Sequence, residues 1–181
     1  MTRSDILVSG EKVVLRRFRP EDHDDVHAFA SDPDVCRFMS WGPNSQADTR
    51  DFLAQAVTVR PSRLDLAILA DQRLIGSASV WTTDIEHRTG ELGYTLRADA
   101  WGQGHGTDAA RALLRLGAEH LRLERIAATC DVDNLASARV LGKIGMSFEG
   151  ILRGYRLVRG ERRDHLAFAR LIESPPIELE R

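Results

Sequence analysis

The stretch Trp101-Gly102-Gln103-Gly104-His105-Gly106-Thr107 decides how the rest of the sequence is interpreted. Three glycines alternate with other residues there, and residues 107–121 follow with apolar side chains at helical spacing. The first turn of a helix offers unpaired N–H groups and partial positive charge, and glycine lets the backbone approach a phosphate closely. The stretch therefore predicts a pyrophosphate site, with a glycine-rich connection that binds nothing as the alternative.

The segments around this turn predict an α+β fold. Before the turn we expect strands at 12–17, 66–70, 74–81 and 91–96, helices at 20–30 and 46–59, and a hairpin at Asp71-Gln72. After the turn we expect helices at 107–121 and 134–144, strands at 125–130, 148–156 and 166–172, and a turn at 159–161. This order indicates a mostly antiparallel sheet with one parallel crossover, in a single domain spanning residues 1–181.

Composition excludes several classes of protein. The chain has 181 residues, 43% apolar and 29% charged, with a net charge of -2. This balance gives no basic excess for nucleic acid, and no apolar run is long enough to span a membrane. No signal peptide is apparent, and Cys36 and Cys130 have no metal-ligand spacing. We therefore expect a cytoplasmic protein with reduced thiols and no metal.

Two pyrophosphate cofactors compete for the glycine turn. A dinucleotide fingerprint requires a third glycine where Thr107 stands, and it belongs in the first unit of a parallel sheet. Asp131 and Asp133 nevertheless follow the next predicted strand, where a ribose-binding acid would lie. A dinucleotide-binding oxidoreductase, with NAD(H) and a parallel sheet, therefore remains one alternative.

From Trp101 onward the sequence resembles the coenzyme-A loop of the GNAT superfamily of N-acetyltransferases. Trp101 departs from the usual glutamine or arginine of that loop, but it resembles the branch that acetylates the N-termini of ribosomal proteins (alanine and serine acetyltransferases). The same branch is similar at residues 91–94, at 107–109, at 133–137, at Gly145-Met146, and at Gly160 with Asp164-His165. The resemblance extends over residues 13–171.

The resemblance implies acetyl-CoA as cosubstrate and a central sheet with a splayed parallel strand pair, flanked by helices. The pantetheine arm would pair with backbone in the strand before the loop, and the pyrophosphate would lie on loop amides. The implied cofactor-binding residues are Tyr94, Thr95, Leu96, Gln103, Gly104, His105, Gly106, Thr107 and Asn134. The alternative for Asn134 is a polar residue that only starts a helix.

Acetyl transfer to an amine requires a neutral amine, stabilisation of the tetrahedral oxyanion and a proton for the departing thiolate. Many GNAT enzymes place a tyrosine where Leu141 stands, so Ser137, one helical turn earlier, is the candidate to hydrogen-bond the leaving sulfur. A serine satisfied by backbone is its alternative. Glu91 is the candidate base, with His87 or a water as substitutes. Cys130 ends a strand beside the reaction site, where burial alone also explains it.

The acceptor is the least determined part. The resemblance places its pocket between the loop at residues 38–41, Trp81 and the last hairpin with Tyr155. The amine could belong to a small molecule or to a protein N-terminus, and Asp32, Asp34 and Glu91 would suit a cation. The resemblance also leaves open a homodimer, and a coenzyme-A-binding regulatory module that has lost turnover.

Overall fold

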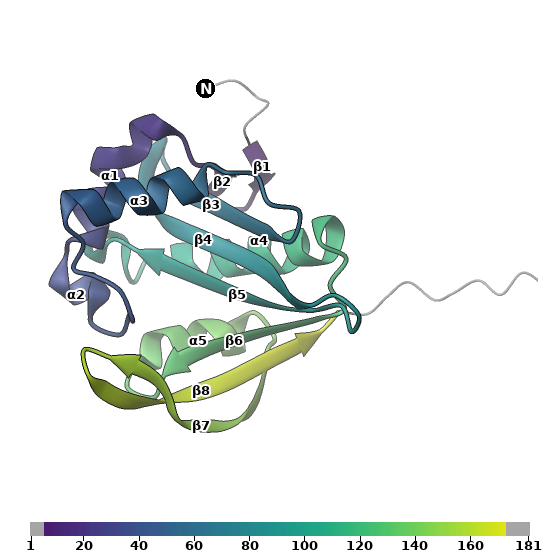
Figure 1. Cartoon of the computed structure of the whole chain (residues 1–181). Helices are drawn as coiled ribbons and strands as arrows, with labels where there is room; N and C mark the ends of the chain where they lie inside the picture. Colours follow the sequence, from purple (N-terminus) through teal and green to yellow (C-terminus); the bar gives the residue numbers. More distant parts are fainter. Residues whose placement is uncertain (1–5, 173–181) are drawn as a thin grey trace, which may run out of the picture.

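A computed structural model describes residues 6–172, whose eight strands form one sheet in the order β1-β2-β3-β4-β5-β6-β8-β7 (Figure 1). The strands are β1 Ile6–Ser9, β2 Val14–Arg17, β3 Arg63–Ala70, β4 Arg73–Asp84, β5 Thr89–Leu96, β6 Arg125–Asp131, β7 Ser147–Val158 and β8 Glu161–Leu171. The helices are α1 His23–Ala30, α2 Pro33–Cys36, α3 Gln46–Ala56, α4 His105–His120 and α5 Leu135–Lys143, with 3-10 turns η2 Pro20–Asp22 and η3 Ala98–Ala100.

Every strand pair is antiparallel except β5 with β6. The predicted α+β class and mixed sheet are therefore confirmed. The dinucleotide-binding alternative requires a parallel sheet, and that expectation is wrong for this chain. Each of the strands β1 to β4 pairs antiparallel with the next strand in the sequence.

The hairpin between β3 and β4 forms where the sequence predicts it. Asp71 and Gln72 both adopt positive φ, 48° and 66°, the backbone that a two-residue hairpin loop requires. Ala70 then pairs with Arg73 across the turn. The register sends Leu66 and Ile68 to one face of the sheet, and Ala67 and Leu69 to the other.

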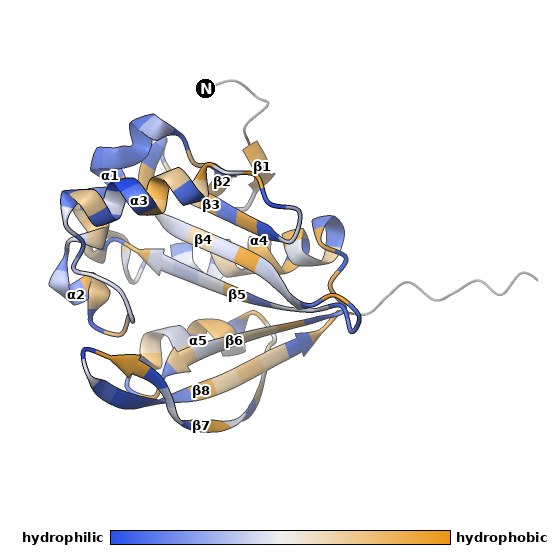
Figure 2. Ribbon diagram, in the orientation of Figure 1, coloured by the Kyte–Doolittle hydropathy of each residue, from blue (hydrophilic) through white to orange (hydrophobic). Residues whose placement is uncertain are grey.

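Helices cover both faces of the first five strands. On one face α1 and α3 enclose a core that includes Phe18, Val26 and Leu53. On the other face α4 packs against β4 and β5, with Leu113 and Leu116 in the core. Figure 2 shows hydrophilic and hydrophobic residues interspersed along α3 and α4. A strand between two helical layers reads as a continuous apolar run, which explains the sequence of β3.

Strands β6, β8 and β7 form the rest of the sheet, and α5 packs beside them near α4 (Figure 1). Strand β8 lies between β6 and β7, so the last strand in the sequence joins two strands that do not pair with each other. Only Val158 of the twelve residues of β7 is buried. This edge of the sheet is consequently much more exposed than β3.

Two short elements escaped prediction. Strand β1 has four residues and pairs with β2 across a turn at Gly10–Lys12, so β2 begins at Val14, two residues later than expected. Helix α2 is a single turn that starts after Asp32, whose side chain accepts a hydrogen bond from the N–H of Asp34. Elements this short carry no periodic pattern in the sequence.

Candidate active site

Strands β5 and β6 separate after three residue pairs. Thr89, Gly90 and Glu91 pair with Arg125, Ile126 and Ala127, respectively, and the register ends there. Beyond that point β5 continues along β4 as far as Leu96, and β6 continues along β8 as far as Asp131. The facing edges of both strands therefore lack a strand partner over several residues. We call this opening the β5–β6 gap.

The glycine turn lies at the far end of β5 and leads directly into α4. Gly102 and Gly104 have φ of 75° and 87°, the left-handed region that other residues adopt only with strain. Polar side chains brace this loop by turning back on it: Trp101 Nε1 donates to the Leu96 carbonyl at 3.0 Å, and Gln103 Nε2 donates to the Asp99 carbonyl at 2.8 Å. The amides at the start of α4 are thus presented by a fixed loop.

Residues His105, Gly106 and Thr107, in the first turn of α4, differ in what surrounds them. His105 Nδ1 lies 3.3 Å from the Ala100 carbonyl, so its ring braces the loop. Gly106 is buried, and a Cβ atom there would lie 3.1 Å from Tyr94 Cε2. Glycine at this position lets the first turn of α4 rest on β5. Thr107 is half-buried in the same turn.

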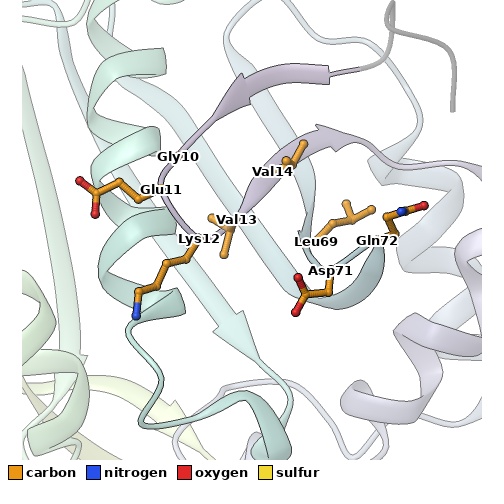
Figure 3. A pocket seen from close by; sticks show the side chains of 8 residues that line it. All are labelled: Gly10, Glu11, Lys12, Val13, Val14, Leu69, Asp71 and Gln72. Carbon is orange, nitrogen blue, oxygen red and sulfur yellow. The ribbon is translucent and has the colours of Figure 1, made fainter.

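The turn between β1 and β2 is attached to the start of α4. Asp108 Oδ2 accepts hydrogen bonds from the backbone N–H groups of Lys12 and Val13, at 2.7 and 2.9 Å. Lys12 Nζ in turn donates to the carbonyl of Gln103 at 2.9 Å. Lys12 lines a pocket of about 200 Å³ between this turn and the β3–β4 turn (Figure 3). A cation therefore stands beside the glycine turn, which the sequence analysis missed because the residues are 91 positions apart.

Ser137 and Tyr94 meet on the side of the gap that α4 and α5 cover. The hydroxyl of Tyr94 lies 3.4 Å from that of Ser137, and burial raises the pKa of Tyr94 to about 12. Cys130, at the end of β6, belongs to the same group, and burial raises the pKa of its thiol to about 11. Both shifts keep these groups protonated at neutral pH. Leu141 has no hydroxyl to offer, but Tyr94 on β5 places its hydroxyl beside Ser137, one helical turn from Leu141.

Asn134 is the N-cap of α5. Its side-chain Oδ1 accepts the N–H of Ser137 at 3.1 Å, which orients the first turn of the helix. The helix-starting role considered for Asn134 is therefore present. By fixing Ser137 it also acts on the hydroxyl pair just described.

Glu91 lies on the opposite face of β5. It pairs across the strands with Trp81, and it stands at the last residue pair before the β5–β6 gap opens. Its carboxylate is half-buried and has no hydrogen bond or ion pair within residues 6–172. Tyr94 and Glu91 thus approach the gap from opposite faces. Thr95 shares the face of Glu91, and Leu96 that of Tyr94.

His87 is not brought to this group. It lies in the exposed turn between β4 and β5, where its backbone N–H donates to Asp84 at 3.0 Å. The structure gives its ring no contact with Glu91, Ser137 or Tyr94.

The last hairpin is tied to the loop after α2. The guanidinium of Arg159, in the β7–β8 turn, donates to the carbonyls of Cys36, Arg37 and Gly42 at 2.9 to 3.4 Å. Phe38 and Met39 in that loop are half-buried, and Ser40 and Trp41 are exposed. Arg159, which the sequence analysis did not select, therefore joins two of the segments that were expected to border the acceptor.

An ion-pair network lies at the end of β6. Arg163 donates to both oxygens of Asp131 at 2.9 and 3.0 Å, and to Asp133 at 2.6 Å. Burial works against ionisation of Asp131, but the hydrogen bonds from Arg163 and from the Asp133 N–H outweigh it, so its pKa lies below the ordinary value. These two acids, the candidate ribose ligands of the dinucleotide alternative, instead bind an arginine.

Residues 6–172 lack two features that the sequence also did not predict, a metal-binding group and a membrane-spanning helix. No group of three or more His, Cys, Asp or Glu side chains is placed to hold a metal ion. No helix in the same range is long and apolar enough to cross a membrane.

Comparisons with known proteins agree with this architecture. A family model described as an acetyltransferase (GNAT) domain matches residues 12–147. Uncharacterized N-acetyltransferase p20 of Bacillus licheniformis is 28% identical, over 89% of this chain and 93% of that protein. The ribosomal-protein-serine acetyltransferase of Escherichia coli (strain K12) is 32% identical, over 59% of this chain and 60% of that protein.

Solved structures give the same result. An acetyltransferase of the GNAT family from Bacillus anthracis has a TM-score of 0.82 and 29% identity, covering 91% of this chain and 97% of that one. A microcin C7 self-immunity acetyltransferase, solved with acetyl-CoA and AMP, also has a TM-score of 0.82. At 21% identity over 93% of this chain and 99% of that one, it shares the fold.

Proposed function

Because the chain belongs to the GNAT family of acetyltransferases, we propose that it moves an acetyl group from acetyl-CoA to an amine bound at the β5–β6 gap. The observation that carries this proposal is the gap itself, which has a braced glycine turn at one end and a pair of hydroxyls on one side. The relatives named N-acetyltransferase support the reaction class.

The glycine turn and the edge of β5 would hold the cosubstrate. Backbone N–H groups of residues 103–107 would hydrogen-bond the pyrophosphate, and the ammonium of Lys12 would exchange the Gln103 carbonyl for a phosphate oxygen. The pantetheine arm would then run along the unpaired edge of β5 at Tyr94, Thr95 and Leu96. Its amide groups would take the place of the missing strand partner. Asn134 and Gly104 would complete the set of residues that hold the cosubstrate.

The chemistry needs one bond formed and one broken. The nitrogen of a neutral amine attacks the thioester carbon, and the carbon–sulfur bond breaks to leave a thiolate. Ser137 would donate a hydrogen bond to that sulfur, and the Tyr94 hydroxyl, 3.4 Å behind it, would donate to Ser137. The proton that the amine loses would go to Glu91, directly or through a water, because that carboxylate has no described partner.

The acceptor class is an amine on a small molecule or a protein N-terminus. One relative is named a ribosomal-protein-serine acetyltransferase, and another is named an L-amino acid N-acetyltransferase. Both names fit an α-amine. A homodimer remains a prediction.

Acetyl transfer can be tested in two steps. Melting temperature is first measured with acetyl-CoA, CoA and NADH, because a ligand at 100 times its dissociation constant stabilises a protein by about 2.7 kcal/mol. Release of free CoA thiol is then measured with a panel of α-amines. We expect stabilisation by acetyl-CoA and CoA, and thiol release that depends on the amine.

The two steps separate the alternatives. Stabilisation without thiol release for any amine would favour a coenzyme-A-binding module. Stabilisation by NADH alone would contradict the proposal. The Lys12→Gln variant should weaken acetyl-CoA binding, while Lys143→Gln, an exposed lysine at the end of α5, should not.

A further inference from the structure

His165 is a buried histidine without a hydrogen bond. Its exposed fraction is 4%, and neither ring nitrogen has a partner among the described residues. Burial, followed by the charge of Arg156, lowers its pKa, so the ring is neutral at pH 7 and carries one N–H donor and one acceptor. Leaving such groups unsatisfied lowers the stability of the folded protein. An imidazole of this kind calls for a partner from outside the chain, a water or a group of a ligand.

Arg156 is a charged group in a similar situation. It lies directly opposite Arg163 in the β7–β8 ladder, and like charges at opposed positions are destabilising. Arg163 is compensated by Asp131 and Asp133, as described above. The guanidinium of Arg156 lies 5.3 Å from the centre of the Tyr155 ring and has no hydrogen bond or ion pair to residues 6–172. Arg156 is half-buried, and no ion pair with a described residue neutralises its charge.

The two groups belong to one cluster. The ring of Tyr155 lies 5.6 Å from that of His165, so Arg156, Tyr155 and His165 are contiguous. His165 pairs with Asp131 across the strands, four residues along β6 from the last pair with β5. Since alternate residues share a face, the cluster lies on the face of the sheet that carries Glu91, roughly 13 Å along the strand.

The surrounding hairpin is strongly basic. Residues 153–163 contain five arginines and one acid, Glu161. Figure 2 shows the end of this hairpin as strongly hydrophilic. Arg159 and Arg162 donate to backbone carbonyls, which leave their positive charge in place. With Arg163 compensated, the other four arginines still outnumber Glu161 and Asp164, so the field of the hairpin favours an anion over an isolated ammonium group.

We propose that Arg156 and His165 bind an anionic group, a carboxylate or a phosphate, of the molecule whose amine is acetylated. This inference rests on the proposed acetyl transfer and specifies its acceptor. The guanidinium supplies a charge-assisted hydrogen bond, and the imidazole N–H supplies a second donor. Tyr155, which is 41% exposed, covers the ring and moves aside. It lies in an irregular part of β7, where the ladder to β8 is interrupted between Leu152 and Arg156.

This site changes what the acidic residues near the acceptor pocket imply. Asp32, Asp34 and Glu91 suit an ammonium group, and the basic hairpin suits an anion. A molecule with an amine at one end and an anion at the other satisfies both regions. A simple polyamine satisfies one and is repelled by the other.

Binding is tested first without catalysis. Histidine-labelled protein is titrated with inorganic phosphate and with acetate at constant ionic strength, and the imidazole NMR signals are followed. The His165 signal is the one missing from His165→Phe. We expect it to shift saturably with at least one anion in the wild type and in Arg162→Gln, but not in Arg156→Gln. A His165 signal that neither anion moves overturns the inference.

Matched amines then identify the anion. Alanine is compared with alaninamide, and phosphoethanolamine with ethanolamine, in the thiol-release assay. The anionic member of one pair should have at least tenfold higher kcat/KM, and Arg156→Gln should remove that preference while Arg156→Lys keeps part of it. Equal kcat/KM within both pairs overturns the inference, even though transfer itself has then been demonstrated.

A structural role for His165 makes a different prediction. His165→Phe removes two unsatisfied polar atoms, so its melting temperature should equal or exceed that of the wild type while KM for the anionic acceptor rises severalfold. A fall in melting temperature with KM unchanged would assign the ring to packing. Absence of acetyl-CoA stabilisation would instead contradict the proposed function, and the anion titration would stand apart from it.

Discussion

Strands β3 and β7 show how differently the two halves of the sheet are built. Seven of the eight residues of β3 are buried between two helical layers, whereas one of the twelve residues of β7 is buried. The first half, β1 to β5, has helices on both faces. The second half, β6, β8 and β7, is packed mainly on the side of α5.

Unpartnered polar groups occur in both halves, since Glu91, His23 Nε2 and Arg60 Nε in the first half also lack described partners, but the second half adds a concentration of positive charge. In the second half, His165 and Arg156 lack hydrogen-bond partners among the described residues, and the hairpin carries five arginines. Groups like these lower stability, and proteins tolerate them where a ligand compensates. The first half therefore holds most of the buried core, and the second half holds the anion site proposed above. The gap between them is where the reaction would occur.

The largest effect on stability should come from the first half. Leu66→Ala removes a side chain that is 0% exposed in the core under α4, and should lower the free energy of unfolding by about 3 kcal/mol. Leu157→Ala in β7, where the side chain is 55% exposed, should change it by less than about 0.5 kcal/mol. Urea unfolding of both variants gives the comparison. Equal losses would show that exposure does not separate the two halves.

A substitution at the gap should affect turnover more than stability. Ser137→Ala removes the hydroxyl that would hydrogen-bond the leaving sulfur, and kcat should fall about 100-fold with little change in melting temperature. Tyr94→Phe should reduce kcat less, because its hydroxyl acts through Ser137. Ser147→Ala, an exposed serine of β7, is the control. A normal kcat for Ser137→Ala would remove this residue from the mechanism.

The glycine turn should show an intermediate effect. Gly104→Ala places a Cβ on a residue with φ of 87°, which costs about 1–2 kcal/mol and disturbs the phosphate-binding amides. Acetyl-CoA should therefore stabilise the variant less than the wild type. Gly142→Ala is the control, because a Cβ there meets nothing within 4 Å and alanine favours α5. A Gly104→Ala protein that binds acetyl-CoA normally would contradict the assignment of the turn.

The smallest effect should appear in the pH dependence of stability. Folding lowers the pKa of His165 from 6.5, through burial and then Arg156 and Arg163, with Asp131 and Asp164 acting in the opposite direction. The unfolded chain then binds more protons, so this contribution is present above pH 6.5 and is lost as the pH falls below it. His165→Phe should flatten the decline measured by urea unfolding between pH 7 and pH 5. An unchanged decline, or one equally flattened in His120→Gln, would count against this explanation.

Much of the fold could be predicted because its signals are local. The glycine turn, the hairpin at Asp71-Gln72 and the amphipathic pattern of α4 each depend on neighbouring residues. The resemblance then placed Ser137 and Glu91 beside one gap, on which the site predictions rest. Local periodicity could not reveal β1 or α2, each only four residues long.

The residues that the sequence analysis missed are joined through long-range contacts. Lys12 meets Gln103 across 91 positions, and Arg159 meets Cys36 across 123. Neither lysine nor arginine on a surface is unusual, so composition gives no signal for them. His165 belongs to a stretch that resembles the family, but no chemical role could be predicted for it. An unsatisfied imidazole can be recognised only when its neighbours are known. Partners distant in sequence require the folded chain.

The strand order has a consequence for synthesis of the protein. Strands β1 to β5 pair with their sequence neighbours and can assemble as the chain leaves the ribosome. β7 and the part of β6 beyond its three pairs with β5 must wait, because the strand that joins them, β8, is the last of the eight to be made. Arg159, which links the hairpin to the loop after α2, also emerges late. A partly made chain can therefore carry the glycine turn well before it has the last hairpin.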